Sequence, residues 1–390
     1  MPASSQPPAA GEAARIFGLD LLRAAAILSV LLAHLFALLY PHVGWLGILG
    51  HGGFFGVELF FVLSGFLIGQ ILIRRGADFG RGGALPEFYL RRWFRTLPLF
   101  WLLVVANVLL DRWQQGSRLA LPDLLGHGLF VRNFASPSLM FLPESWSLAV
   151  EEWFYLLFPA ALWLGLRFTR RFDAVFLLAA GAFYLFSTGA RLLAASHPDR
   201  TWEWLRVLVL YRLDAIMIGI LAAWLAARFP AVWRRWAWPC AGLGALLVVG
   251  MYATLWRIEG SWVANGADAW FARTARFNLI SLGFALLLPA AAGWKLSTEN
   301  AASLAIRRIA LWSYAIYLVQ HPLSRLIMPH CFRDWQTSAY QGWALFVTVL
   351  AATIGLSALL HHGFEARCTR LRETAAPALR RLFGEKADPA

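Results

Sequence analysis

The stretch FGLDLLRAAAILSVLLAHLFALLY at residues 17–40 decides the fold of this chain. Only Asp20, Arg23 and His34 interrupt a run of apolar residues that is long enough to cross a bilayer, since a spanning helix needs about 20 of them. The run is too long for the apolar part of a signal peptide, and sixteen residues of Pro/Ala/Ser-rich sequence precede it. We therefore interpret it as a membrane span that is retained.

The composition of the whole chain extends this interpretation. Hydrophobic residues make up 59% of the 390 residues and charged residues 15%, with 20 Trp and 29 Phe. A soluble domain has roughly 45–50% apolar and about 25% charged residues, and its surface has to be polar. The three cysteines are scattered and odd in number, which argues against a disulfide framework or a metal knuckle. The sequence predicts an all-α, integral, multi-pass membrane protein with no metal site.

Apolar runs predict a bundle of about ten transmembrane helices. The candidate spans lie at 17–40, 53–73, 93–111, 148–166, 172–190, 207–227, 236–256, 277–294, 309–330 and 341–361. They form one membrane domain over 17–365, between a disordered N-terminal tail at 1–16 and a basic tail at 366–390.

The basic residues predict the orientation of these spans. If the N-terminus is cytoplasmic, 22 of the 35 Lys and Arg residues fall in inner segments and the C-terminal tail, and 10 fall in outer loops. This bias favours two cytoplasmic termini, because inner loops carry the excess of Lys and Arg. Topology and anchoring at the lipid surface thus explain the net charge of +13, and we expect no nucleic-acid partner.

Ionisable residues at membrane depth are costly and point to function. Arg23 and His34 are eleven residues apart, or three helical turns plus ~20°, so they share one face with ~16 Å between them along the axis. Glu58, in GHGGFFGVELFFVLSGF, lies at about the depth of His34. We hypothesise that Glu58 orients the His34 imidazole and raises its basicity. The glycines at 50–56 indicate close helix packing, because the chain has no G-x-S-x-G nucleophile elbow.

Arginines cluster at the inner boundary of the third span, in FYLRRWFRTLPLFW. Arg92 and Arg95 share a helix face, and the Arg fork suits a phosphate clamp, with ordinary positive-inside anchoring as the alternative. For Arg91 we expect anchoring only.

Three later segments also place polar groups inside spans. In SWSLAVEEWFYLLFP, Ser147 and Glu151 share a face and Glu152 points ~100° away. In YRLDAIMIG, Arg212 and Asp214 are expected to neutralise one another. In SYAIYLVQHP, a polar stripe of Tyr314, Tyr317 and His321 indicates the lining of a cleft.

Together these segments resemble the acyltransferase 3 family of multi-pass bacterial membrane acyltransferases. The resemblance rests on the R-x10-H spacing of Arg23 and His34, the segment around Glu58, the R-x-x-R of Arg92 and Arg95, and the three later segments in order. It covers about residues 17–365. Glu58 stands where many members have Asp, and the chain has no room for the extracytoplasmic hydrolase-like domain that some members append.

The resemblance implies a ten-helix enzyme of the bacterial cytoplasmic (inner) membrane that moves an acyl group, most often acetyl, from acyl-CoA to a hydroxyl of a carbohydrate or glycan. It implies that His34 is the catalytic base and that Arg92 and Arg95 lie near the donor. With Glu58 as the partner of His34, we expect a substrate-binding set of Arg23, Arg92, Arg95, Ser147, Glu151, Glu152, Arg212, Tyr314 and His321. Acyl-CoA acts as a donor substrate, and no tightly bound cofactor is expected.

Two other functions stay open from the sequence. One is a proton-coupled transporter whose intramembrane His, Glu and Arg form a relay, although we find neither the internal repeat nor the Gly/Pro-broken helices common in transporters. The other is a carbohydrate-binding membrane component without catalytic activity. The acceptor, the acyl chain length and the oligomeric state cannot be read from the sequence.

Overall fold

The computed structural model describes residues 16–50, 52–116, 121–134, 141–197, 199–258, 267–296 and 298–371, and all of their regular structure is helical. Of the predicted tail at 1–16 only Ile16 is described, and the predicted tail at 366–390 is described as far as residue 371. The long helices are α1 (Phe17–Leu39), α3 (Gly53–Arg75), α4 (Ala84–Gln115), α6 (Ser145–Phe168), α7 (Phe172–Ala195), α9 (Leu213–Arg228), α11 (Ala237–Ile258), α13 (Ala275–Gly293), α14 (Ala301–Cys331) and α15 (Ala339–Leu360). The short helices are α2 (Leu46–Gly50), α5 (Leu121–Gly128), α8 (Trp202–Val207), α10 (Pro230–Arg235), α12 (Ala267–Arg273), η1 (Gly76–Gly80), η2 (Arg132–Phe134), η3 (Val209–Tyr211) and η4 (His361–Glu365).

Nine helices of the described residues are long and apolar enough to cross a membrane, and they coincide with nine of the ten expected spans. The expected span at 207–227 is the exception. Its first residues form η3, and Arg212 leaves helical geometry with φ −125° and ψ −4°, so that α9 has only 16 residues. We did not expect this broken helix from the sequence, because neither Gly nor Pro marks the break.

Two helices begin well before their apolar runs. The helix α4 starts at Ala84 instead of 93, and α14 starts at Ala301 instead of 309. The extra turns at the start of each helix carry arginines, so the helix extends past the apolar segment. The start of α14 is fixed by a capping box, in which the Asn300 side chain accepts from the Ser303 amide at 2.8 Å and Ser303 Oγ accepts from the Asn300 amide at 2.9 Å.

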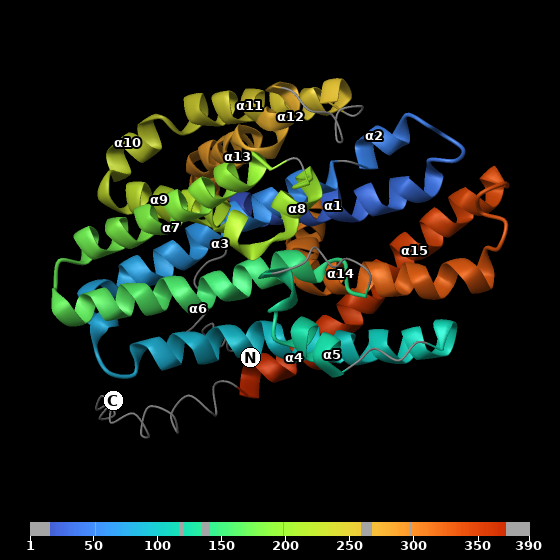
Figure 1. The fold of residues 1–390 in the computed structure, drawn as a ribbon, viewed down its shortest axis with the longest axis horizontal. Coiled ribbons are helices and arrows are strands. Elements are labelled where there is room, and N and C mark those ends of the chain that lie inside the picture. The colour runs from blue at the N-terminus through green and yellow to red at the C-terminus, as the bar shows by residue number, and fades with distance from the viewer. Residues whose placement is uncertain are drawn as a thin grey trace, which may run out of the picture.

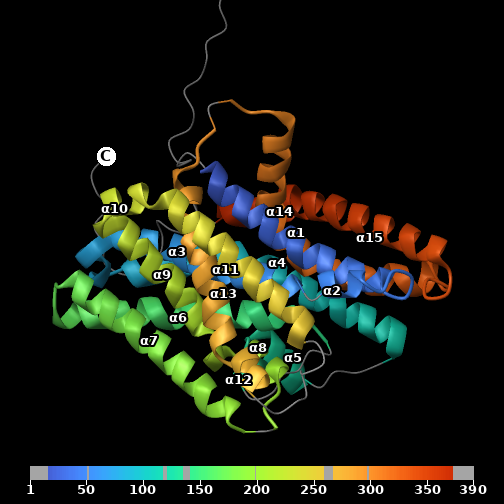
Figure 2. The same ribbon diagram turned by 90° about the horizontal axis from the view of Figure 1, so that it is seen from above.

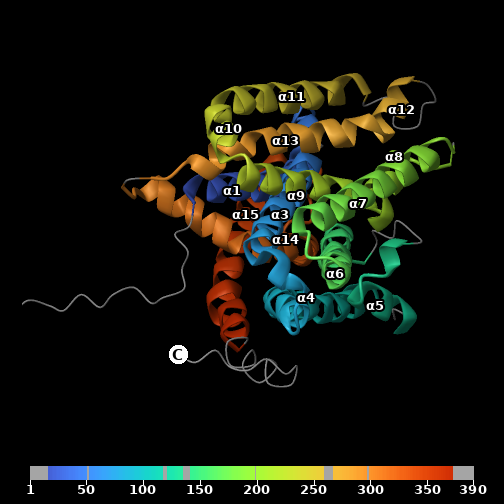
Figure 3. The same ribbon diagram turned by 90° about the vertical axis from the view of Figure 1, so that its left-hand side faces the viewer.

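The helices lie side by side as a bundle (Figure 1). The α3–α4, α6–α7 and α9–α10 connections lie at one end of the bundle and the α14–α15 connection at the other. Seen from above, α7 and α15 flank the bundle on opposite sides (Figure 2). Seen along it, α11 and α13 lie at one edge and α4 and α5 at the other, with α3 and α14 between (Figure 3). We call the end with the α3–α4 connection the inner end, because its connections carry the predicted cytoplasmic arginines.

Close helix contacts explain the glycines of α3. A Cβ atom at Gly56 would lie less than 3.0 Å from the Ala26 carbonyl oxygen of α1, and one at Gly65 would meet the Ile216 carbonyl oxygen of α9 equally closely. Gly219 of α9 faces Val62 of α3 in the same way. The packing role expected for the glycines is confirmed, and it places α3 at the centre of the bundle.

Candidate active site

One cavity of about 480 Å³ lies between α1, α3, α4, α6 and α14. Residues of α3 line it from Val57 to Arg74. At ~1.5 Å per residue, these seventeen steps span ~26 Å, which is most of the thickness of a membrane. The cavity is therefore a passage along α3 from the inner end of the bundle toward its outer half.

The inner part of the cavity is basic. Arg23, Arg74, Arg92 and Arg95 line it, from three different helices. The guanidinium of Arg92 lies over the Tyr155 ring at 4.0 Å from its centroid. The positive charges of Arg23 and Arg92 repel that of Arg95. The structure thus brings together the three arginines singled out in the sequence and adds Arg74, which we had not singled out.

Neighbouring Arg91 has a different environment. It is 50% exposed and pairs with Glu87 at 2.7 Å, one turn earlier on α4. This arrangement agrees with the anchoring role expected for Arg91, and it makes Arg91 a useful reference for the arginines that line the cavity.

The middle of the cavity holds a carboxylate. Glu151 accepts hydrogen bonds from Ser64 Oγ at 2.6 Å and from Tyr155 Oη at 3.2 Å. Glu152 is buried beside Thr96 of α4 and is absent from the cavity lining, so the two carboxyl groups point in different directions as expected from helical geometry. The structure supports a cavity position for Glu151 but not for Glu152.

The outer end of the cavity is closed by a hydroxyl pair. Ser147 Oγ and Tyr317 Oη lie 2.6 Å apart, and Tyr317 Oη donates to the Glu144 carbonyl oxygen at 3.1 Å. Tyr314 lines the cavity one turn nearer the inner end and donates to the Thr96 carbonyl oxygen at 2.7 Å. The expected cleft lining is confirmed for Tyr314 and Tyr317, whereas His321 lies one turn beyond them.

His34 lies beyond this hydroxyl pair. Its imidazole is within hydrogen-bonding reach of the Gln320 side chain and lies close enough to Arg206 for the two groups to interact electrostatically. The residue as a whole is exposed, and His321 and Arg206 lie nearby. Arg23 therefore lines the cavity, and His34, ~16 Å farther along α1, does not.

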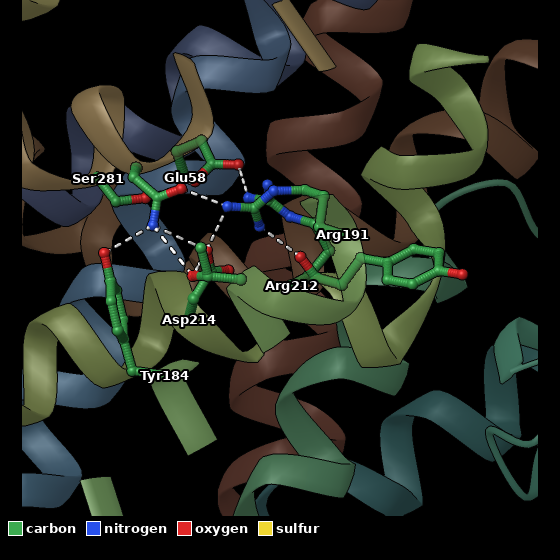
Figure 4. Close-up of polar contacts among 9 residues, drawn as sticks. Glu58, Tyr184, Arg191, Arg212, Asp214 and Ser281 are labelled. Carbon is green, nitrogen blue, oxygen red and sulfur yellow. Dashed lines mark hydrogen bonds and ion pairs between the residues drawn. The ribbon is translucent and has the colours of Figure 1, made fainter. Parts of the chain in front are cut away.

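Glu58 has other partners than the one we hypothesised (Figure 4). The Arg212 guanidinium donates to one carboxylate oxygen, and Ser281 Oγ donates to the other at 2.8 Å. Both Glu58 and Arg212 are 0% exposed. The His34–Glu58 pair is thus a wrong prediction: a buried carboxylate takes the nearest buried cation, which comes from the break before α9.

The same network corrects the prediction for Arg212 and Asp214. Asp214 pairs with Arg191 of α7 at 2.6 Å and accepts from Asn278 of α13 at 3.0 Å. Arg212 precedes α9 and turns toward α3 instead (Figure 4). Arg212 lies at the non-helical start of α9 and Asp214 in its first turn, and each has its partner on another helix. Arg212 is thereby removed from the expected substrate-binding set.

Several residues of the site escaped the sequence reasoning. Ser64 and Tyr155 lie within segments that we quoted, and Tyr155 follows Glu151 by one turn, so the spacing could have found it. Arg206 and Gln320 gave no signal, because only tertiary packing brings them to His34. Within the described ranges, no group of three or more His, Cys, Asp or Glu side chains could hold a metal ion.

The arrangement can bind an elongated anionic molecule with its far end toward the Ser147–Tyr317 pair. Four guanidinium groups at the inner end suit phosphate groups, and the apolar wall of α3 suits a narrow organic chain. The hydroxyl pair and His34 follow at the outer end. A comparison with protein families matches residues 16–362 to the acyltransferase domain of acyltransferase 3. The chain belongs to the acyltransferase 3 family.

Part of this chain is similar to curated proteins. It is 36% identical over 165 residues to the provisionally named peptidoglycan O-acetyltransferase YrhL of Bacillus subtilis (strain 168), covering 38% of this chain and 24% of that protein. It is 32% identical over 167 residues to the peptidoglycan O-acetyltransferase OatA of Listeria monocytogenes, covering 39% and 25%. The matched region spans about a quarter of the length of these relatives, and no solved structure matches the chain significantly. The chain thus belongs to an acyltransferase family, and nine helices of its described residues are long and apolar enough to cross a membrane.

Proposed function

We propose that the protein transfers an acyl group, most often acetyl, from acyl-CoA to a hydroxyl of a glycan. The observation that carries the proposal is the cavity along α3, which is basic at its inner end and reaches Ser147 and Tyr317, with Tyr317 one turn before the Gln320 that contacts His34. The names of the relatives support a glycan acceptor and acetyl as the acyl group.

The donor occupies the cavity from its inner end. Arg23, Arg92 and Arg95 bind the phosphate groups of coenzyme A, and each charge-assisted hydrogen bond contributes about 1.5–3 kcal/mol. The thioester arm follows α3 past Ser64 and Glu151 to the hydroxyl pair. Glu151 is held by two hydroxyl donors and shapes the path of the arm.

The reaction takes place at the outer end. His34 accepts the proton of the acceptor hydroxyl, whose oxygen attacks the thioester carbonyl carbon. The new C–O bond forms, the C–S bond breaks, and the proton passes from His34 to the departing thiolate. Gln320 within hydrogen-bonding reach of the imidazole holds its orientation, the role we had given to Glu58.

The test uses membrane vesicles given labelled acetyl-CoA and a soluble tetramer of N-acetylglucosamine. Wild type labels the tetramer, and His34→Ala lowers the rate about 100-fold or more, the scale of a lost general base. Equal rates in the two proteins would show that His34 is not the base. Counterflow of a solute without acyl-CoA would favour the transporter alternative instead.

A further inference from the structure

A group of polar side chains lies on the outer side of the Ser147–Tyr317 pair. We call it the outer polar cluster, and it consists of His34, Glu144, Arg206, Gln320 and His321. Glu144 immediately precedes α6, and its Oε1 lies 4.0 Å from His321 Nδ1. Gln320, next to His321 in sequence, reaches His34. Four separate segments, α1, the start of α6, α8 and α14, thus bring these groups to one place.

The cluster is rich in polar atoms whose hydrogen-bonding capacity is unused by the protein. In the described part of the chain, both carboxyl oxygens of Glu144 and Nδ1 of His321 are buried without a hydrogen-bond partner. Nε of Arg206 is in the same condition. Buried polar atoms in folded proteins nearly always have partners, so such a concentration beside a reactive imidazole indicates a binding site.

The side chains of the outer polar cluster differ in how exposed they are. His34 as a whole residue is exposed, the His321 side chain is 35% exposed, and the Glu144 side chain is 4% exposed. A molecule that approaches from the outer end therefore meets the two imidazoles first and reaches the carboxyl group at the bottom. The proposed reaction brings the thioester and the acceptor hydroxyl together at the Ser147–Tyr317 pair, where the cavity lining ends.

The chemistry of the cluster fits a polyhydroxylated molecule. A sugar hydroxyl donates one hydrogen bond and accepts others, and a carboxyl, a carboxamide and an imidazole provide both kinds of partner. Burial raises the pKa of Glu144 to about 8, so the carboxyl group carries a proton at neutral pH and can both donate and accept. A protonated carboxyl does not select for a cationic ligand, which favours an uncharged sugar.

We propose that Glu144, Gln320 and His321 form the acceptor subsite and hold a carbohydrate with one hydroxyl at His34. This inference rests on the proposed function and adds two residues, Glu144 and Gln320, that determine binding of the acceptor. It also divides the protein into a donor side along α3 and an acceptor side beyond Tyr317.

The experiment measures the KM for each of the two substrates with the protein in lipid nanodiscs. For Glu144→Ala and Gln320→Ala, we expect the KM for the N-acetylglucosamine tetramer to rise about tenfold or more, the scale of one lost hydrogen bond to a ligand, while the KM for acetyl-CoA stays within about twofold. Arg95→Ala shows the opposite split. Leu326→Ala, an exposed position on the same helix as Gln320, leaves both values unchanged.

Binding of the tetramer without acetyl-CoA separates this inference from the proposed function. If wild type binds the tetramer and Glu144→Ala does not, the subsite stands even if no acetyl group is transferred. Glu144→Gln, which retains the hydrogen-bonding shape, should recover most of the binding. Equal rises of both KM values, or tetramer binding by Glu144→Ala as tight as by wild type, would overturn the assignment.

Discussion

Replacing Arg212 with Met removes the cation that faces Glu58 and leaves the carboxylate in a site where both side chains are 0% exposed. Breaking a buried ion pair by removing one partner costs about 3–5 kcal/mol, because the remaining charge has lost its compensation. Since about 1.4 kcal/mol corresponds to a factor of ten, the unfolded fraction should rise roughly 100- to 4,000-fold.

The double variant Glu58→Leu/Arg212→Met should recover most of this loss. Replacing both members of a buried pair by apolar side chains of similar size is often neutral or stabilising. Arg132→Met supplies the control, because Arg132 pairs with Asp123 at 2.7 Å while 40% and 36% exposed, and such a pair contributes only about 0–1 kcal/mol.

The assay is thermal unfolding in nanodiscs, followed by tryptophan fluorescence, together with acetyl transfer at a temperature where all variants are folded. Arg212→Met should unfold well below the double variant, and the double variant should keep transfer. If Arg212→Met were as stable as the double variant, the buried-pair argument would be refuted. A double variant that folds but has no activity would instead indicate that Glu58 takes part in the reaction.

The other predictions concern the donor site, the packing and the pH dependence. Arg95→Ala should raise the KM for acetyl-CoA about tenfold or more by removing a charge-assisted hydrogen bond, whereas Arg91→Ala, outside the cavity, should change it less than about twofold in the same vesicle assay. Gly65→Ala should destabilise the α3–α9 contact by about 1–3 kcal/mol in thermal unfolding, while Gly293→Ala, which meets nothing within 4 Å, should cost far less; equal losses would contradict the packing argument. Because burial raises the pKa of Glu144 from 4.5 to about 8, its contribution to stability is complete below pH 4.5 and is lost as pH rises through about 8. Glu144→Gln should therefore gain stability relative to wild type across this range in melting curves, and a constant difference would show that the carboxyl does not titrate there.

The sequence alone determined the class of the fold and most of the residues at the site. A run of apolar residues as long as 17–40 is stable in a bilayer as a helix, because a helix satisfies its own backbone hydrogen bonds there. The periodicity of one helix also predicted that Ser147 and Glu151 share a face, and that Tyr314 and Tyr317 line a cleft. These relations are local, so spacing is sufficient to reveal them.

Only the tertiary structure determines which buried charged side chains pair with one another. Arg212 turns toward Glu58 because the chain breaks before α9, and Asp214 then pairs with Arg191. His34 meets Gln320 because α1 packs against α14, a contact between residues almost three hundred positions apart. Pairing of buried charges depends on the distance between side chains on different helices, and the periodicity of a single helix carries no information about that distance.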